Sequence, residues 1–300
     1  MLEVAKFGGI VPPVVTPLHA DESLDDRALR RIVRRAVEAG VHGIFAGGST
    51  GEVAALTDDV RRHALDVVLE EVGGQVPVLA GVGEAGTRRC ADWARRAEIA
   101  GADAVVAILP YYYATSTVAE AVRHFEEVAA ATALPVVLYN IPSRTKSAIP
   151  LEAVQVLCKS DRFIGIKDSA ESLNGFYRLL QLRGPKFRVF QGSEMQAGPS
   201  LLMGADGAVL GICSLAPHLA VRIYEAAKAG DLARTLRYQE ILADMNTLYW
   251  VAGGSQLGNL KYALHYVGLC EPYVTSPLAS PDARAQARIR EIVDRNRAEL

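Results

Sequence analysis

The chain has 300 residues, of which 50% are hydrophobic and 22% charged, so it can bury a large core in one large domain or two ordinary ones. Its 32 basic and 34 acidic residues give a formal net charge of −2, which argues against nucleic acid or an anionic membrane as a partner. No apolar run reaches the roughly 18 residues that a membrane span needs.

Short apolar runs alternate along the chain with longer amphipathic segments, which is the pattern of repeated β-α units. In chain order, strands are expected near Ile10–Val15, Gly43–Ala46, Val76–Ala80, Ala104–Ile108, Pro135–Tyr139, Phe163–Lys167, Arg188–Gln191 and Gly207–Leu210. Between them, helices are expected over Asp25–Ala39, Asp58–Val72, Thr87–Ala100, Val118–Ala131, Leu151–Leu157 and Ser172–Leu182. Three of these helices are followed by a glycine, a common helix end.

Eight parallel strands with crossover helices predict a (β/α)₈ TIM barrel over residues 1–229. The remaining residues, 230–300, are helical in pattern and carry no strand signal, so we expect an appended C-terminal helical subdomain. A proline-containing stretch at 271–277 interrupts it before a final charged helix. A doubly wound open sheet is the alternative fold, but no Gly-x-Gly-x-x-Gly follows the first strand.

Lys167 alone among the lysines ends a strand-like apolar run, the sixth expected strand. An ammonium group drawn out of water loses solvation, and the neutral amine that results is a nucleophile for carbonyl groups. The other interpretation is a strand-end lysine that reaches solvent or pairs with Asp168 or Glu171. Barrel enzymes place their chemistry at the carboxyl ends of the strands, which favours a catalytic lysine here.

Period-two alternation assigns the faces of this sixth strand. It places Phe163, Gly165 and Lys167 on the inner face, with Ile164 and Ile166 toward the outer helices.

Three further features stand at the carboxyl ends of neighbouring strands. Tyr139 ends the fifth strand and could face Lys167 as a proton shuttle, or could fill the barrel mouth as an aromatic plug. The glycine-rich turn 47–52 offers amides and hydroxyls to a carboxylate or oxyanion. The loop after Tyr139 carries Arg144, whose forked cation suits a carboxylate, although a surface arginine is the commoner meaning.

Taken together, these residues resemble the pyruvate-dependent class I aldolases and lyases that include dihydrodipicolinate synthase and N-acetylneuraminate lyase. The resemblance covers essentially the whole chain. It rests on motifs that occur in the expected order, at Gly48–Glu52, Pro110–Tyr112, Tyr139–Pro142, Gly165–Lys167, Gly192–Ser193 and Gly204–Gly207.

The resemblance implies a role for each matched residue. Lys167 would form a Schiff base with the 2-oxo group of pyruvate, and Tyr139 would be the general acid and base. Ser49 and Thr50 would bind the pyruvate carboxylate, in a pocket also lined by Gly192 and Val209. Ser49 would in addition be one of the catalytic residues.

The family resemblance also implies an assembly. Tyr112 would belong to a proton relay that is reached across a subunit boundary. That arrangement needs a homo-oligomer, usually a homotetramer built as a dimer of dimers.

The sequence does not decide between two aldehydes as the second substrate, aspartate semialdehyde and a sugar-derived partner. The loop 140–145 with Arg144 resembles dihydrodipicolinate synthase, in which the arginine binds the carboxylate of aspartate semialdehyde. By contrast, Pro110–Tyr113, Lys167–Ser169 and Gly192–Glu194 resemble the 2-keto-3-deoxy sugar-acid aldolases, and the segment 255–261 lacks the proline-rich stretch usual in the synthase. We therefore expect a lyase that joins or splits pyruvate and an aldehyde. A dehydratase of 2-oxo-3-deoxy acids that uses the same imine is the alternative.

Two interpretations lie outside this class. One is a phosphosugar isomerase on the same barrel, with the loop 204–211 gripping phosphate. The other is a non-catalytic protein that binds a 2-oxo acid, because a fold does not fix a function.

No cofactor or metal is predicted. A protonated imine is itself an electron sink, and the histidines show no ligand spacing. The four cysteines are far apart, which is typical of reduced thiols in a cytoplasmic protein. Residues 1–6 lack a basic region followed by a long apolar stretch, so we expect no export.

Overall fold

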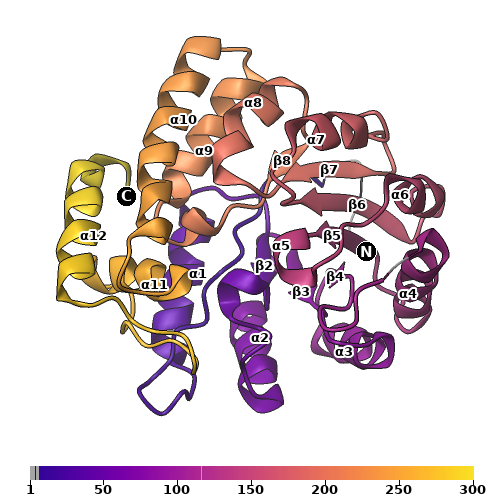
Figure 1. Cartoon of the computed structure of the whole chain (residues 1–300), viewed down its shortest axis with the longest axis horizontal. Helices are drawn as coiled ribbons and strands as arrows, with labels where there is room; N and C mark the ends of the chain where they lie inside the picture. The colour runs from indigo at the N-terminus through magenta and orange to yellow at the C-terminus, as the bar shows by residue number, and fades with distance from the viewer. Residues whose placement is uncertain (1–3, 5–6, 116) are drawn as a thin grey trace.

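Eight parallel strands form one sheet within the residues that this computed structural model describes, namely 4, 7–115 and 117–300. Most of the N-terminal stretch used above to predict no export therefore lies outside the described residues. The strand order is β1-β8-β7-β6-β5-β4-β3-β2, and a bridge between Pro13 and Phe45 joins the two ends of this order. The sheet closes into a barrel surrounded by helices (Figure 1), which confirms the predicted (β/α)₈ fold.

The strands agree with the predicted runs to within a few residues, except for β1. They are β1 (Gly9–Ile10), β2 (Ile44–Ala46), β3 (Val78–Gly81), β4 (Ala104–Ile108), β5 (Val136–Asn140), β6 (Phe163–Asp168), β7 (Arg188–Gln191) and β8 (Gly207–Ala208). β1 is shorter than predicted because Pro12 and Pro13 follow one residue after its end, and a proline has no N–H to give to a neighbouring strand.

Side-chain caps mark the start of several of the helices, and a left-handed glycine marks the end of some. Those around the barrel are α1 (Asp26–Glu38), α2 (Asp58–Val72), α3 (Thr87–Ala100), α4 (Val118–Ala130), α5 (Pro142–Thr145), α6 (Leu151–Leu157), α7 (Leu173–Leu180), α8 (Ala197–Leu202) and α9 (Pro217–Lys228). For example, the Thr57 hydroxyl accepts from the N–H of Val60 at the start of α2, and Gly73 ends that helix with a φ of 54°.

The last 70 residues of the chain are helical, as the sequence pattern predicts. They contain α10 (Leu232–Asn246), the 3₁₀ turn η5 (Thr247–Trp250), α11 (Gln256–Tyr266), α12 (Ala283–Arg295) and the short 3₁₀ turn η6 (Arg297–Glu299). In Figure 1 these orange to yellow elements lie together on one side of the barrel. Among the described residues, no helix is long and apolar enough to cross a membrane.

Two apolar clusters hold the barrel together. The larger one lies between the strands and the helices. The smaller one fills the barrel interior, with members that include Val11, Phe45, Leu79, Val106, Val137, Tyr139, Ile164, Phe190 and Val209. Because this plug fills the interior, a ligand must bind at an end of the barrel.

The predicted faces of β6 are wrong at its first two residues. Phe163 packs in the outer cluster and Ile164 in the inner one, the reverse of the prediction. The cause is a register shift, since Val136 pairs with Phe163 but Val137 pairs with Gly165, which leaves one extra residue on β6. Beyond this irregularity the prediction holds, because Ile166 faces outward and Lys167 lies opposite Tyr139.

The closure between β1 and β8 depends on the absence of a side chain at Gly207. A Cβ atom there would overlap the backbone oxygen of Gly9 and stand 2.7 Å from its nitrogen. Gly207→Ala should therefore lower the free energy of unfolding by about 3 kcal/mol or more, because neither strand can yield without opening the barrel. Urea denaturation measures this effect.

Gly86→Ala is the matched control for this prediction. A Cβ at Gly86 meets nothing within 4 Å, and its φ of −158° suits any residue. Gly86 is the N-cap of α3, where glycine is preferred to alanine, so a loss of about 1 kcal/mol or less is expected there. An equal loss in both variants would contradict the role of Gly207 in closure.

Candidate active site

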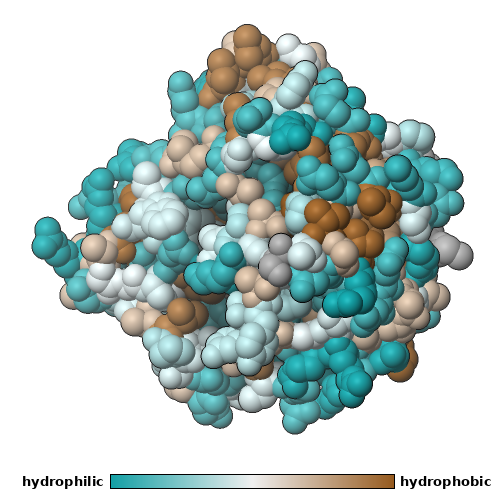
Figure 2. Space-filling view, turned by 45° about the vertical axis from the view of Figure 1, so that its right-hand side comes forward, coloured by the Kyte–Doolittle hydropathy of each residue, from teal (hydrophilic) through white to brown (hydrophobic). Residues whose placement is uncertain are grey.

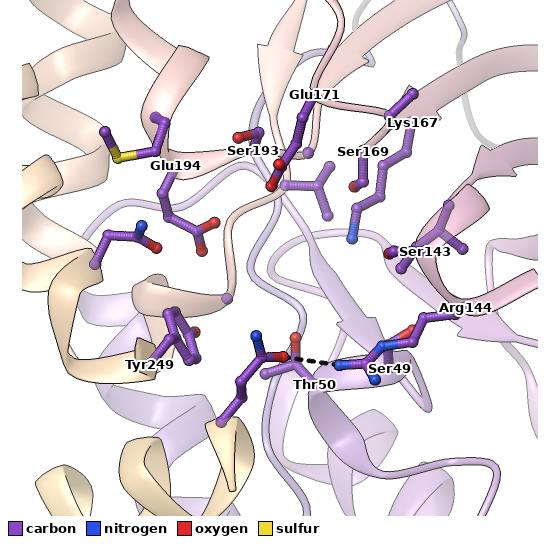
Figure 3. A pocket seen from close by; sticks show the side chains of 18 of the residues that line it. Ser49, Thr50, Ser143, Arg144, Lys167, Ser169, Glu171, Ser193, Glu194 and Tyr249 are labelled. Carbon is purple, nitrogen blue, oxygen red and sulfur yellow. Dashed lines mark hydrogen bonds between the residues drawn. The ribbon is translucent and has the colours of Figure 1, made fainter. Parts of the chain in front are cut away.

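A cavity of about 590 Å³ opens at the carboxyl ends of the strands. Its base is formed by strand ends and the turns that follow them, and its wall by residues of η5 and α11 (Figure 3). Seven of the eight predicted site residues line it, namely Ser49, Thr50, Tyr139, Arg144, Lys167, Gly192 and Val209. The cavity therefore brings together residues that are up to 160 positions apart in the chain, between Ser49 and Val209.

Lys167 stands at the centre of this arrangement. Its side chain rises from β6 and only 5% of the residue is exposed, so it does not reach solvent. Its Nζ lies 4.1 Å from the centre of the Tyr139 ring and 5.3 Å from that of Phe45. Within the described part of the chain, this Nζ makes neither a hydrogen bond nor an ion pair. The amine is thus enclosed by aromatic surfaces and is not engaged by a carboxylate.

The interpretation of Lys167 as one half of an ion pair with Asp168 is wrong. Asp168 points to the other face of β6, where its Oδ1 accepts from Asn140 Nδ2 at 2.6 Å. The Oδ1 of Asn140 in turn accepts from the backbone N–H of Ile149 at 2.9 Å. This buried network ties β5 to β6 and fixes the end of the loop that carries Arg144. Burial raises the pKa of the Asp168 carboxyl.

The turn η2 (Ser49–Gly51) follows β2 and presents Ser49 and Thr50 to the cavity. The N–H of Gly51 donates to Gly48 O at 3.0 Å, and the Gly51 carbonyl accepts from Thr16 Oγ1 at 2.8 Å. The turn is therefore held from below by the loop after β1. It offers uncharged donors at the place predicted to hold a carboxylate.

The ends of β6 and β7 approach each other so closely at Gly192 that there is no room for a side chain. A Cβ atom at this position would overlap Ser169 Oγ and stand 3.0 Å from Lys167 Cε. The backbone N–H groups of Gly192 and Ser193 both donate to Gln191 Oε1 at 2.9 Å, and Gln191 is buried. The end of β7 is thus held directly against the lysine.

Arg144 lies at the rim rather than in the depth of the cavity. It belongs to the short helix α5, and its Nη2 donates to Gln256 Oε1 of α11 at 2.9 Å, the contact drawn as a dashed line in Figure 3. The guanidinium is exposed on this side, so its remaining donors face the opening.

Sequence reasoning assigned no role to several polar residues of the cavity, above all Ser169, Glu194 and Tyr249, although the first two belong to motifs named above. Ser169 lies two residues beyond Lys167, and its Oγ is buried without a hydrogen-bond partner among the described residues. The period-two rule could have found it. Glu194 and Tyr249 sit opposite Lys167 in Figure 3 and come from the 3₁₀ turn η3 (Glu194–Gln196) after β7 and from η5. No local pattern marks Tyr249.

The oxygens of Glu194, Tyr249 and Thr50 converge on one point. A Cβ placed on Gly211 would stand 2.6 Å from Tyr249 Oη, 3.3 Å from Thr50 Oγ1 and 3.4 Å from Glu194 Oε1. Glu194 Oε1 also accepts from the backbone N–H of Ile212 at 3.1 Å. Burial raises the pKa of Glu194 and raises that of Tyr249 well above its usual value.

Tyr112 is the one predicted site residue outside the cavity. It is 76% exposed and packs edge-on against Tyr113, with 4.9 Å between the ring centres. Its part in a proton relay remains a prediction. Over residues 4, 7–115 and 117–300, no group of three His, Cys, Asp or Glu side chains is placed to hold a metal.

Comparison with known proteins places the chain within one family. The model of the dihydrodipicolinate synthetase family matches residues 6–296. A 4-hydroxy-tetrahydrodipicolinate synthase of Methanopyrus kandleri is 32% identical over 299 residues, which cover 98% of this chain and 97% of the relative. A probable 2-dehydro-3-deoxy-D-pentonate aldolase of Escherichia coli is 31% identical over 293 residues, covering 96% and 97%.

A solved structure shares both the fold and the sequence signal. It is a prophage protein of the dihydrodipicolinic acid synthase family from Escherichia coli, crystallised in complex with pyruvate. Its TM-score is 0.92 at 30% identity, with 97% of this chain and 99% of that chain covered.

The raised pKa of Asp168 generates a prediction on stability. Asp168→Asn should have a larger free energy of unfolding than the wild type at pH 8, because the folded protein disfavours the ionised carboxyl. The asparagine Oδ1 can still accept from Asn140. As pH falls through the folded pKa of Asp168, the wild type becomes protonated and regains this stability, so the difference should shrink. Urea denaturation from pH 8 to pH 4 measures it, and a difference that grows on acidification would contradict the prediction.

Proposed function

The chain belongs to the dihydrodipicolinate synthetase family and is an enzyme of that family, and we propose that it joins or splits pyruvate and an aldehyde through an imine on Lys167. Family membership sets aside the two interpretations from outside this class, the phosphosugar isomerase and the non-catalytic binding protein. The observation that carries the proposal is an enclosed, unpaired amine beside a phenol. It stands within the same cavity as a turn of uncharged donors.

In the cleavage direction, the amine of Lys167 attacks C2 of a 2-oxo-3-deoxy acid, and loss of water gives a protonated imine. Tyr139 takes the proton from the C4 hydroxyl, the C3–C4 bond breaks, and its electrons move into the imine to form an enamine. The aldehyde leaves, C3 of the enamine is protonated, and hydrolysis of the imine releases pyruvate. Ser49 and Thr50 hold the substrate carboxylate throughout, which leaves Arg144 for the other substrate.

For the aldehyde, we propose a hydroxylated, sugar-derived partner. The wall opposite Lys167 carries neutral hydrogen-bonding groups and the carboxylate of Glu194, and Glu171 stands at the rim. Hydroxyl groups suit such a wall, since they can donate to a carboxylate and accept from an amide or a phenol. A second substrate carboxylate would have to approach both glutamates. The pentonate aldolase among the relatives has a name of this class.

The synthase activity is the second candidate, because one observation favours it. The exposed donors of Arg144 face the opening of the cavity and could bind the carboxylate of aspartate semialdehyde. A dehydratase would share the imine, so analysis of the products separates it from an aldolase. Release of pyruvate and an aldehyde marks cleavage, whereas a retained carbon chain with loss of water marks dehydration.

We further propose a cytoplasmic homo-oligomer, a dimer of dimers, in which Tyr112 reaches a partner's site. Exposed aromatic surface at Tyr112 and Tyr113 supports a contact at this loop. Figure 2 shows further hydrophobic side chains gathered in separate groups on one face of the molecule. The cysteines are free thiols, as expected in a reducing compartment.

The imine is tested by trapping. Incubation with pyruvate and borohydride should leave a reduced pyruvyl adduct on the wild type, seen by intact-mass analysis and mapped by peptide mass to Lys167. Lys167→Ala should show no adduct and a loss of turnover of at least about 1,000-fold, because the covalent route is removed. Lys186→Ala, at an exposed lysine, is the control and should keep the adduct. An adduct that persists in Lys167→Ala would disprove the assignment.

The aldehyde class is tested at Glu194. Glu194→Gln should reduce kcat/KM for glycolaldehyde and D-glyceraldehyde about tenfold, the usual cost of one hydrogen bond to a charged group. It should leave trapping of pyruvate on Lys167 unchanged. Equal activity of wild type and variant toward both hydroxylated aldehydes would remove Glu194 from aldehyde selection. Higher activity with aspartate semialdehyde than with either aldehyde would favour the synthase instead.

A further inference from the structure

The buried pair of Glu52 and Lys261 joins the candidate active site to the C-terminal helices. Lys261 is 0% exposed and Glu52 is 4% exposed. Lys261 Nζ lies 2.5 Å from Glu52 Oε1 and donates to the carbonyl of Tyr273 at 2.7 Å. The other carboxylate oxygen, Glu52 Oε2, accepts from the N–H of Thr275 at 2.7 Å and from its hydroxyl at 2.8 Å.

Burying two charges is costly, so this pair is a poor way to gain stability alone. Desolvation lowers the pKa of Lys261 even though Glu52 opposes the shift. An apolar pair of the same size would fill this space with a smaller desolvation cost. What the ion pair does provide is a fixed position for each partner, because directional contacts hold both of its ends.

Glu52 lies directly after the turn that lines the cavity, so holding Glu52 in place also holds that turn. It is the residue that ends the Ser49–Gly51 turn, with a φ of 60°, and its N–H donates to Ser49 O at 3.1 Å. A left-handed φ is unfavourable for glutamate, and the anchored side chain offsets part of this cost. The side chain of Glu52 therefore helps to hold the turn that presents Ser49 and Thr50.

We propose that Glu52 and Lys261 are positioning residues for the binding of the substrate carboxylate, an inference that rests on the function proposed above. Two effects combine in this role. The pair holds the Ser49–Thr50 turn in place. In addition, Lys261 neutralises a carboxylate that would otherwise stand, uncompensated and buried, two residues from Thr50 and repel the incoming 2-oxo acid.

Helix α11 extends the same role to the rest of the cavity. Its Gln256 accepts from Arg144, and its Asn259 Nδ2 donates to the carbonyls of Leu248 at 3.1 Å and Val251 at 2.9 Å. These carbonyls flank Tyr249 in the turn η5. Helix α11 thus contacts Glu52 at the end of the Ser49–Gly51 turn, Arg144, and the turn η5 that carries Tyr249.

Two variants of Lys261 and Glu52 separate positioning from general stability. Lys261→Met should raise, by roughly tenfold, the pyruvate concentration that gives half-maximal borohydride-trapped adduct on Lys167. In the double variant Glu52→Gln with Lys261→Met, no unpaired carboxylate is left at position 52. The contact that holds the Ser49–Thr50 turn to α11 is still lost. The half-saturating concentration of the double variant should therefore fall between those of the wild type and Lys261→Met.

Arg188→Met is the matched control. Arg188 pairs with Asp206 at 2.8 Å, and both residues lie at the amino ends of β7 and β8, at the opposite end of the barrel from Lys167. This variant also strands a largely buried carboxylate, so thermal denaturation should show a loss of stability. It should leave the half-saturating pyruvate concentration at the wild-type value.

Each outcome decides the proposal. An unchanged half-saturating concentration in Lys261→Met, or an equal rise in Arg188→Met, overturns it while leaving the proposed function in place. Absence of an adduct on the wild type overturns the proposed function, and this inference falls with it. If Lys261→Met does not fold, the double variant decides, because a wild-type half-saturating concentration there is the result that overturns positioning by the pair.

Discussion

Closure of the barrel is the constraint on which the rest of this structure depends. The sheet closes where Gly207 meets Gly9 and where the bridge between Pro13 and Phe45 joins β1 to β2. Once the ring is closed, every parallel strand ends on the same side, and the turns that follow the strands face a common opening. Lys167, Tyr139 and the Ser49–Gly51 turn meet there although each belongs to a different β-α unit.

The irregularity in β6 shows how finely the inner face is set. Simple alternation puts Phe163 inside the barrel, but the extra residue opposite β5 turns Phe163 outward and Ile164 inward. A branched aliphatic side chain thus fills the interior at this level, and the strand returns to alternation in time to point Lys167 into the cavity. The predicted inward direction of the Lys167 side chain was correct, because Lys167 lies near the end of the strand, beyond the register shift.

The sequence predicts those parts of the fold and the site that depend on local pattern. Strands, helices and the glycine ends of helices follow from periodicity and capping, and Lys167 follows from its place at a strand end. The wall opposite it could not be predicted in this way. Tyr249 and Gln256 lie in helical sequence with ordinary polarity, and only the packing of η5 and α11 against the barrel brings them to the cavity. Glu52 belongs to a motif that the sequence shows, but its pairing with Lys261 could not be predicted, since a pair 209 positions apart is recognisable only when the chain is folded.

The arrangement separates the chemistry from the choice of partner. The residues proposed for imine formation come from strand ends and from one turn, all of them held by contacts within the barrel or by the Glu52–Lys261 pair. The residues proposed to meet the aldehyde are Arg144 of α5, which lies at the rim, and Glu194 and Tyr249, which line the opposite wall. Changes in that wall can therefore alter the aldehyde without moving the amine. On the proposed function, the same lysine chemistry is compatible with different aldehydes, and the relatives do carry names of both synthases and sugar-acid aldolases. The wall opposite Lys167 is then where selection of the second substrate is to be sought.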